Sequence, residues 1–415
     1  MTPHRKSLLE RFLRYQAIPT ESKANGGKTV PSTKEQWNLS LLLEEELRSL
    51  GLTDIHLDDH CCLTACLPQR GEGNFPSIGF CCHLDTASIG GNPAPSPQLI
   101  HYEGGNVVLN EEKRILMKIE DHPELQSYAG EDILFTDGSG VLGADDKAGI
   151  TAVMDSISRF AGSTCPHGNI FLAFVPDEEV GLRGSKSLDF TRFHPDFAFT
   201  LDCCGTGECS WETFYAGTVT VTFTGVPAHP MNGKGRLVNP LLPACELVHS
   251  FDPKETPEWT EGKEGYIWCR ELAGTPEKAV LTIQIRDHDK NRYEEKKWRI
   301  AEAVWKMAAV YPKVNVTCSM EDSYGNIMDA MTKENGIALD FLYEAFAEAD
   351  LTPRPFAMRG GTDGSYLSTK GIFTPNYFTG ALNFHSIYEF LPLSGLEKAA
   401  EVTRNLILLT RKRKS

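Results

Sequence analysis

The residues best suited to chemistry in this sequence are two adjacent glutamates, Glu178 and Glu179. They stand in the motif Pro-Asp-Glu-Glu-Val-Gly, directly after the apolar run 170–175. Carboxylates crowded at the exit of a buried strand repel one another and gain nothing from packing. A metal ion is the usual compensation for such a cluster. Because the motif taken alone favours a solvated acidic turn, a metal site requires further ligand-type residues elsewhere.

Ligand-type residues also stand at the end of the predicted strand 76–82. Period-two geometry places His83 and Asp85 on one face of this strand end. A neutral imidazole can then bind a metal ion while the carboxylate orients the ring. Taken alone, the pair favours an ordinary surface histidine. It supports a metal site only together with the other candidate ligands.

Two more carboxylates and a second histidine complete the set. Asp145 opens a predicted helix, where a carboxylate also suits plain N-capping. Asp202 ends another apolar strand, and His385 lies near the C-terminus with Glu389 spaced to support it. Strand ends are where α/β sheets place their ligand crevice. Imidazoles and carboxylates without thiolates suit Zn²⁺, with Mn²⁺ or Co²⁺ as substitutes, so the combined set predicts a two-metal site.

The composition excludes several classes of partner. The 415 residues include 41 basic and 56 acidic side chains, a formal net charge of −15. Such a surface repels phosphate backbones and anionic lipid, so neither nucleic acid nor a membrane is an expected partner. No run of about 18 apolar residues occurs, and the charged N-terminal segment does not resemble a signal peptide. We therefore expect a cytoplasmic protein whose 12 cysteines are mostly reduced core residues.

The chain is long enough for two domains. Apolar strands alternating with helix-length segments predict an α/β domain over residues 1–213 and 323–415. Between them, residues 214–322 carry period-two strands and helices in the order βαββαβ, which is typical of a ferredoxin-like α+β domain inserted into the first. Its predicted elements are strand 215–223, helix 239–251, strands 265–272 and 279–287, helix 291–310 and strand 313–319.

A capping box marks one helix start near the N-terminus. Ser32 is followed three residues later by Glu35. The Ser32 hydroxyl is therefore expected to cap a helix that continues to about residue 51.

Several motifs occur in the order found in one enzyme family. They are His-Leu-Asp-Thr, Gly-Ala-Asp-Asp-Lys-Ala-Gly, Pro-Asp-Glu-Glu-Val-Gly, Leu-Asp, Arg-Gly-Gly-Thr-Asp-Gly and Phe-His-Ser-x-x-Glu. The sequence resembles, essentially end to end, the di-zinc metallo-exopeptidases that include peptidase T, the tripeptide aminopeptidase, with carboxypeptidase G and the acylases. The resemblance implies a zinc-exopeptidase-like catalytic domain with a central mixed sheet and an inserted ferredoxin-like lid domain.

The resemblance also implies two zinc ions that share one carboxylate, Asp145. Asp85 would orient His83, and Glu178 would be the general base that takes a proton from a metal-activated water. The peptide bond between Asp145 and Asp146 is expected to be cis. The ligands of one ion would be His83, Asp145 and Asp202, and those of the other Asp145, Glu179 and His385.

Four residues are weaker candidates for substrate contacts. His229, in Gly-Val-Pro-Ala-His-Pro, is similar to a lid histidine that can stabilise an oxyanion, although the segment could be a simple turn. Arg286 and Arg359 could bind a peptide carboxylate through the guanidinium fork, or form surface ion pairs. Asn239 could contact substrate backbone.

Four cysteines depart from the family pattern. Cys81 and Cys82 precede His83, and Cys203 and Cys204 follow Asp202, where small or apolar residues are expected. These thiols could capture metal or oxidise, so they leave the native metal open.

We expect an aminopeptidase that acts on short peptides with a free N-terminus, tripeptides in particular, and a homodimer is possible. A dipeptidase, a carboxypeptidase or an N-acyl amino acid amidohydrolase with the same metal centre is the alternative, because fold and metal chemistry do not separate these activities. A non-catalytic peptide-binding or metal-binding relative would have lost the base or a ligand, yet each of those residues is present.

Overall fold

The computed structural model describes residues 1–24, 26–27 and 29–412, which divide into two compact units. The first contains Met1–Trp211, Ala330–Phe356 and the described residues from Thr362 onward. The second contains Glu212–Asp329 and Ala357–Gly361. The first is an α/β unit around a central mixed sheet and the second an inserted α+β unit, which confirms the predicted fold class.

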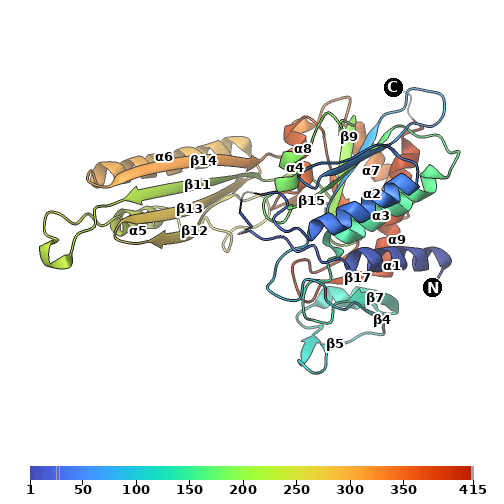
Figure 1. Cartoon of the computed structure of the whole chain (residues 1–415), viewed down its shortest axis with the longest axis horizontal. Helices are drawn as coiled ribbons and strands as arrows, with labels where there is room; N and C mark the ends of the chain where they lie inside the picture. Colours follow the sequence, from blue (N-terminus) through green and yellow to red (C-terminus); the bar gives the residue numbers. More distant parts are fainter. Residues whose placement is uncertain (25, 28, 413–415) are drawn as a thin grey trace. The chain divides into compact units, whose positions relative to one another are not determined.

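A mixed sheet of eight strands forms the centre of the first unit (Figure 1). Its order is β1-β2-β8-β3-β9-β16-β10-β15. The four neighbours β8, β3, β9 and β16 run parallel, whereas β1 pairs antiparallel with β2, β2 with β8 and β10 with β16. The bounds are β1 Thr53–Leu57, β2 Leu63–Leu67, β3 Ile78–His83, β8 Ile170–Val175, β9 Phe197–Cys203, β10 Glu208–Thr213, β15 Arg354–Met358 and β16 Asn376–Phe378.

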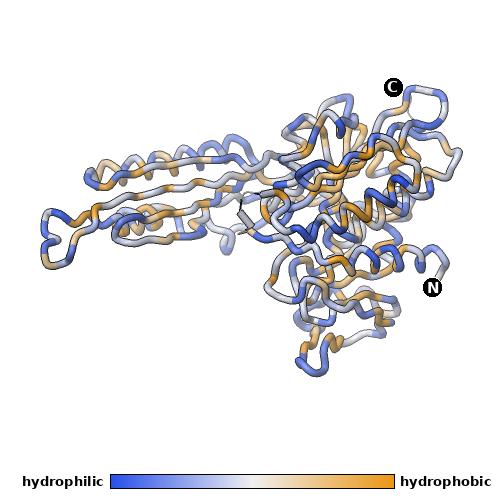
Figure 2. The backbone as a smooth tube through the Cα atoms, viewed as in Figure 1, coloured by the Kyte–Doolittle hydropathy of each residue, from blue (hydrophilic) through white to orange (hydrophobic). Residues whose placement is uncertain are grey.

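Helices cover both faces of this sheet, which is why its strands are apolar on both sides. In β9, Thr200 lies against Gly364 of α8 and Leu201 against Gly149 of α3, so the two helices occupy opposite faces. Hydrophobic residues accordingly gather along these strands (Figure 2). The bounds are α1 Pro3–Gln16, α2 Gln36–Ser49, α3 Ala144–Ala161, α4 Arg183–Ser187, α7 Ile337–Glu348, α8 Asp363–Thr369 and α9 Leu393–Leu409.

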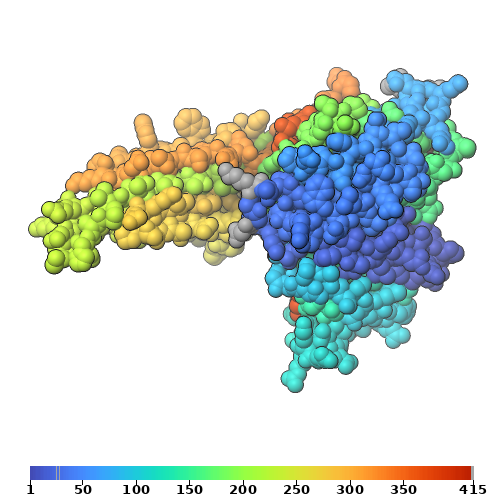
Figure 3. All heavy atoms as spheres, viewed as in Figure 1, coloured from blue at the N-terminus to red at the C-terminus, as the bar shows by residue number. Residues whose placement is uncertain are grey.

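An accessory region, residues 98–135 together with β17, was not predicted. Its three-stranded sheet β17-β7-β4 and its hairpin β5-β6 enclose a small core of their own, which includes Met117, Leu125 and Phe390. The hairpin projects from the first unit (teal in Figure 3). The bounds are β4 Gln98–Tyr102, β5 Val107–Asn110, β6 Ile115–Met117, the 3₁₀ helix η1 Pro123–Tyr128, β7 Glu131–Phe135 and β17 Phe390–Pro392.

The second unit is a four-stranded antiparallel sheet in the order β12-β13-β11-β14, with two helices packed on it. Its core joins alternate residues of β13, such as Leu281 and Ile283, to Leu247 of α5 and Ile300 of α6. The chain order βαββαβ is as predicted. The bounds are β11 Tyr215–Thr224, η2 Pro230–Asn232, α5 Leu241–His249, β12 Tyr266–Gly274, β13 Lys278–Asp287, α6 Lys290–Val310, β14 Asn315–Tyr324 and η3 Ile327–Ala330.

The unit bounds differ from the predicted insertion 214–322. Strand β14 continues to Tyr324, and the side chain of Asn326 accepts a hydrogen bond from the Thr213 backbone N–H at 3.2 Å. Arg359 packs over the Phe214 ring of the same unit. Residues beyond both predicted ends of the insertion therefore make their contacts within the second unit. Periodicity along the sequence does not reveal such contacts.

No helix in the described part of the chain is both long enough and apolar enough to cross a membrane. All 12 cysteines lie in that part and carry free thiols, seven of them buried.

Candidate metal centre

All five predicted ligands come together in the first unit as two overlapping groups. One group contains His83, Asp145 and Asp202, and the other Asp145, Glu179 and His385; within each, one potential ligand atom per residue lies within 4.8 Å of the others. His83 Nε2 lies 3.0 Å from Asp145 Oδ1, and His385 Nε2 lies 3.1 Å from Asp145 Oδ2. Each oxygen of one carboxylate thus faces a different imidazole.

The parallel strands explain this convergence. His83 is the last residue of β3, and Glu179 follows the end of β8. Asp202 is the second-to-last residue of β9. Because β8, β3 and β9 are parallel neighbours, their carboxyl ends meet at one edge of the sheet. Asp145 enters from the first turn of α3, and His385 from the loop between β16 and β17.

The turn that carries Asp145 is held by the carboxylate of Glu389. The Asp145–Asp146 peptide is cis, as expected. Glu389 accepts hydrogen bonds from the backbone N–H groups of Gly143 and Asp145, at 2.8 and 3.0 Å. The prediction that Glu389 supports His385 directly is therefore corrected: its carboxylate holds the Asp145 turn.

Asp146 explains the last glycine of the Gly-Ala-Asp-Asp-Lys-Ala-Gly motif. Its carboxylate accepts a hydrogen bond from the His83 backbone N–H at 3.2 Å. A Cβ at Gly149 would lie only 2.0 Å from Asp146 Oδ1, so a larger residue would displace this carboxylate. The motif thus supplies the proposed ligand Asp145, the carboxylate of Asp146 that holds the His83 backbone, and the glycine that leaves room for that carboxylate.

Asp85 contacts both His83 and the turn after β8. His83 Nδ1 lies 2.9 Å from the Asp85 backbone oxygen and 3.5 Å from the Asp85 carboxylate. That carboxylate accepts hydrogen bonds from the backbone N–H groups of Glu178 and Glu179, at 2.9 and 3.2 Å. Asp85 therefore orients His83 mainly through its main chain, and its side chain fixes the turn that presents the two glutamates.

Replacing Asp85 by alanine should destabilise this turn. The change leaves two partly buried N–H groups without their acceptor, and we expect the free energy of unfolding to fall by about 1–3 kcal/mol. Asp85→Asn keeps one acceptor oxygen and should lose less. Urea denaturation of both variants measures the difference; equal stability of wild type and Asp85→Ala would contradict this role.

Asp177, the third acid of the cluster, is compensated by the protein itself. Its carboxylate accepts hydrogen bonds from the Ser32 backbone and hydroxyl, both at 2.6 Å, and from Gln36 Nε2 at 2.8 Å. The predicted capping role of Ser32 is wrong, since α2 begins at Gln36 and its N-cap residue is Glu35. Ser32 is instead committed to Asp177, which leaves Glu178 and Glu179 as the acids available to the site.

Negative charge dominates the electrostatics of the site. Burial and the nearby charge of Asp202 raise the pKa of Glu178 well above its usual range. Burial and the charge of Asp145 do the same to the pKa of Asp202. Hydrogen bonds with Asp145 and Glu179 raise the pKa of His385 to about 11. Buried carboxylates in excess of nearby cations favour a bound metal ion.

The predicted substrate residues all lie in the second unit. His229 is exposed and lines a hollow with Pro227 and Glu277; its Nδ1 accepts from the Met231 N–H at 3.3 Å. Asn239 Oδ1 accepts from the backbone N–H of Leu241, the first residue of α5, at 3.1 Å, which is a local role at the helix start.

The two arginines are engaged within the second unit and form no surface ion pair with a carboxylate in the contacts described. Arg286 Nη1 donates to the Ile285 carbonyl at 2.9 Å. Arg359 donates through Nη1 to the Glu264 carbonyl and through Nη2 to the Thr260 hydroxyl, both at 2.7 Å, and stacks 5.2 Å from the Phe214 ring. The guanidinium group of Arg359 is therefore more fully engaged in contacts within the unit than that of Arg286.

Three buried residues of this region were not predicted from the sequence. Asn376 accepts a hydrogen bond from the Asp202 backbone N–H at 2.7 Å. Asp363 is buried at the start of α8, and burial raises its pKa to about 7. Lys147 donates to the Ile18 carbonyl at 2.7 Å, and burial lowers its pKa to about 7. Lys147 and Asp363 stand in motifs that carry the resemblance, whereas nothing local in the sequence singles out Asn376.

Comparison with known proteins identifies the family. Residues 138–409 match the model of Peptidase family M20/M25/M40. A Peptidase T-like protein of Yersinia pestis is 44% identical over 97% of this chain and 97% of its own length, and Peptidase T of an Exiguobacterium species is 39% identical over 95% and 96%. A Staphylococcus aureus tripeptidase structure matches with a TM-score of 0.75 at 19% identity, covering 99% of both chains. In agreement with the motif resemblance, the chain belongs to Peptidase family M20/M25/M40.

Proposed function

We propose that this metallo-exopeptidase is a di-zinc aminopeptidase that removes the N-terminal residue from tripeptides. The observation that carries the proposal is the shared Asp145, whose two oxygens face His83 in one ligand group and His385 in the other. Relatives named Peptidase T, 38–39% identical over nearly the whole chain, support the substrate class.

The side chains present fit zinc. Both groups offer imidazole nitrogens and carboxylate oxygens, the donor set that Zn²⁺ takes in catalytic sites. Among the described residues, neither group includes a cysteine, although Cys82 and Cys203 adjoin His83 and Asp202. Burial raises the pKa of both thiols, which disfavours the thiolate form in the absence of metal.

In this proposal the two glutamates have separate tasks. Bound zinc would supply Lewis-acid polarisation of the scissile carbonyl and lower the pKa of water. Glu179 belongs to a ligand group, whereas Glu178 does not, and its buried carboxylate is the base that takes a proton from water and returns it to the leaving amine. Asp85 keeps both in place through their backbone N–H groups.

We assign substrate contacts to the second unit, acting as a lid. His229 is the candidate for stabilising the oxyanion, since its side chain is exposed on that unit. Arg286 is a better candidate for the substrate carboxylate than Arg359, because Arg286 uses Nη1 for backbone contacts whereas Arg359 uses both Nη atoms. Asn239 is the weakest candidate, since it serves the start of α5.

A panel of unmodified and blocked peptides tests the proposed activity. We expect free tripeptides to be cleaved after their first residue with kcat/KM at least about tenfold above that for the matching dipeptides, tetrapeptides and N-acetylated tripeptides. A site that pairs both charged ends of a tripeptide leaves one of its polar groups unpaired when the peptide is shorter, longer or acetylated. Mass spectrometry identifies the bond that is cut. Preference for N-acetylated substrates would replace the proposal with an amidohydrolase, and release of the C-terminal residue with a carboxypeptidase.

A further inference from the structure

His385 differs from the other proposed ligands in how the fold holds it. The others belong to strand ends, the turn after β8 and the first turn of α3. His385 stands in the loop 382–390, with 52% of its side chain exposed and a left-handed backbone conformation, φ 57°. Backbone hydrogen bonds of 2.9 and 3.1 Å between Leu382 and Phe390 close the base of this loop. These hydrogen bonds do not hold the outer part of the loop, where His385 lies.

Asn383, two residues before His385, supplies a contact away from the loop. It also has a left-handed conformation, φ 59°. Its side-chain Nδ2 donates to Glu124 Oε1 at 2.8 Å and lies 3.2 Å from His122 Nδ1. The Tyr388 carbonyl, on the returning arm of the loop, is 3.4 Å from the same nitrogen. One amide group therefore joins both arms of the loop to a distant segment of the chain.

That segment is itself well fixed. His122 and Glu124 stand at the start of η1 in the accessory region, with 19% and 31% of their side chains exposed. The His122 backbone N–H donates to the Lys118 carbonyl at 3.0 Å, and its ring lies 4.7 Å from the Tyr388 ring. Leu125, next to Glu124, is part of the accessory core. The acceptors of the Asn383 amide are thus held by the folded accessory region, against which Tyr388 of the loop also packs.

We propose that Glu124 and His122 are positioning residues for the metal centre, which act through Asn383 to fix the loop that carries His385. The inference rests on the proposed function, because it concerns one of the two zinc ions. It assigns a task to the accessory region, whose strand β17 begins at the end of the same loop, at Phe390. Neither Glu124 nor His122 is a member of a ligand group, so their effect on metal binding must pass through the loop.

The expected signature is selective loss of one ion. Loosening the loop should weaken the group Asp145–Glu179–His385 and leave the group His83–Asp145–Asp202 intact. Supports of metal ligands typically change metal affinity by about 10–100-fold. We expect Glu124→Ala and Asn383→Gly each to weaken one of two zinc equivalents by about tenfold or more. Glycine is chosen at position 383 because it accepts the positive φ without strain.

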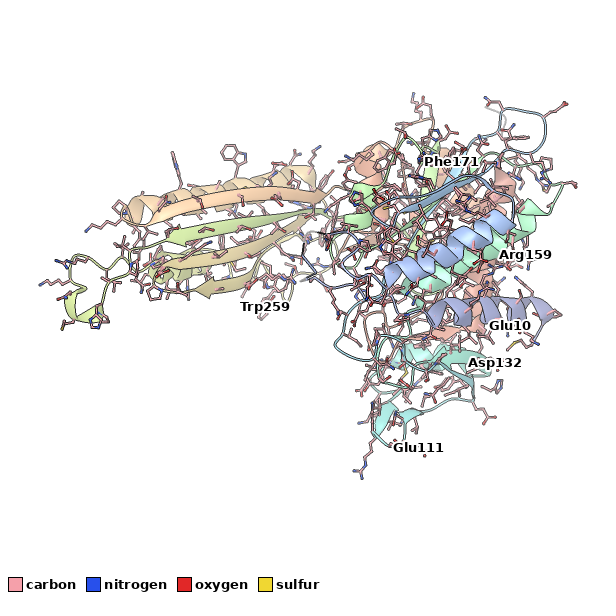
Figure 4. All side chains as sticks on the ribbon, in the orientation of Figure 1. Glu10, Glu111, Asp132, Arg159, Phe171 and Trp259 are labelled. Atoms are coloured by element: carbon pink, nitrogen blue, oxygen red, sulfur yellow. The ribbon has the colours of Figure 1, made fainter. Side chains whose placement is uncertain are left out.

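The experiment is a competitive Zn²⁺ titration of the full chain against a chromogenic chelator, with the melting temperature of each protein measured beside it. Glu124→Gln keeps an acceptor oxygen for Asn383 and should restore both affinities to within about twofold of wild type. Glu111→Ala removes the same charge from the outer end of the accessory hairpin and should change neither affinity (Figure 4).

Two results would overturn the inference. One is unchanged affinity for both ions in Glu124→Ala and Asn383→Gly. The other is equal weakening of both ions together with a lowered melting temperature, which would indicate general unfolding. A wild-type protein that binds fewer than two zinc ions would refute the proposed function, and with it this inference, so the two failures are distinguishable.

Discussion

Replacing Glu178 by glutamine is expected to lower turnover by about 10²- to 10⁴-fold while both zinc ions stay bound. The amide has nearly the shape of the carboxylate but cannot take a proton from water. Glu178 stands outside both ligand groups, so its replacement removes no metal donor. Steady-state kinetics with a tripeptide measures the loss, and elemental analysis of the same sample measures the zinc content.

Glu178→Asp is the matched control for this change. It keeps a titratable carboxylate one methylene short of the original position, so its turnover should lie between those of the wild type and Glu178→Gln. Retention of more than a few per cent of turnover by Glu178→Gln with two bound zinc ions would show that another group is the base. A loss of zinc in that variant would instead place Glu178 among the ligands.

Replacing Asp145 by alanine is expected to abolish binding of both ions and to reduce turnover by roughly 10⁴-fold or more, since the activated water and the polarised carbonyl are lost together. Each oxygen of this carboxylate faces a different histidine, so one substitution removes a donor from both groups. Zinc content after dialysis and residual activity are the two measurements.

Glu179→Ala provides the comparison, because Glu179 belongs to only one group. It should release one ion and keep the other. Circular dichroism of both variants checks that the fold survives. If Asp145→Ala kept one tightly bound ion, or if Glu179→Ala lost both, the bridging assignment would be contradicted.

The first unit shows why the clustering of the proposed ligands could be predicted from the sequence. Each lies at the end of an apolar run or inside a long motif, and parallel strands bring such ends to one edge regardless of the distance along the chain. His83 and Asp202 are far apart in sequence, yet β3 and β9 are direct neighbours. Local pattern and sheet topology therefore agree at the metal centre.

Supporting contacts could not be predicted in the same way. Glu389 and Ser32 both occur in recognisable local patterns, yet each is committed to a partner far along the chain, the Asp145 turn and Asp177 respectively. Asn383 is likewise bonded to Glu124, 259 residues away in sequence. A side-chain hydrogen bond leaves no periodicity in the sequence, so only the fold reveals which partner is chosen.

The strand order of the central sheet has a consequence for how the enzyme is made. Strand β16, encoded late in the chain, lies between β9 and β10, so a nascent chain that ends after β10 has a gap in its sheet. By then His83, Asp145 and Asp202 have all been synthesised, whereas His385 has not. Domains commonly begin to fold during synthesis from the N-terminal side. A ribosome-bound chain of this length nevertheless lacks Asn376 and Glu389, which hold the Asp202 backbone and the Asp145 turn, so both ligand groups take their final form only when the C-terminal segment closes the sheet.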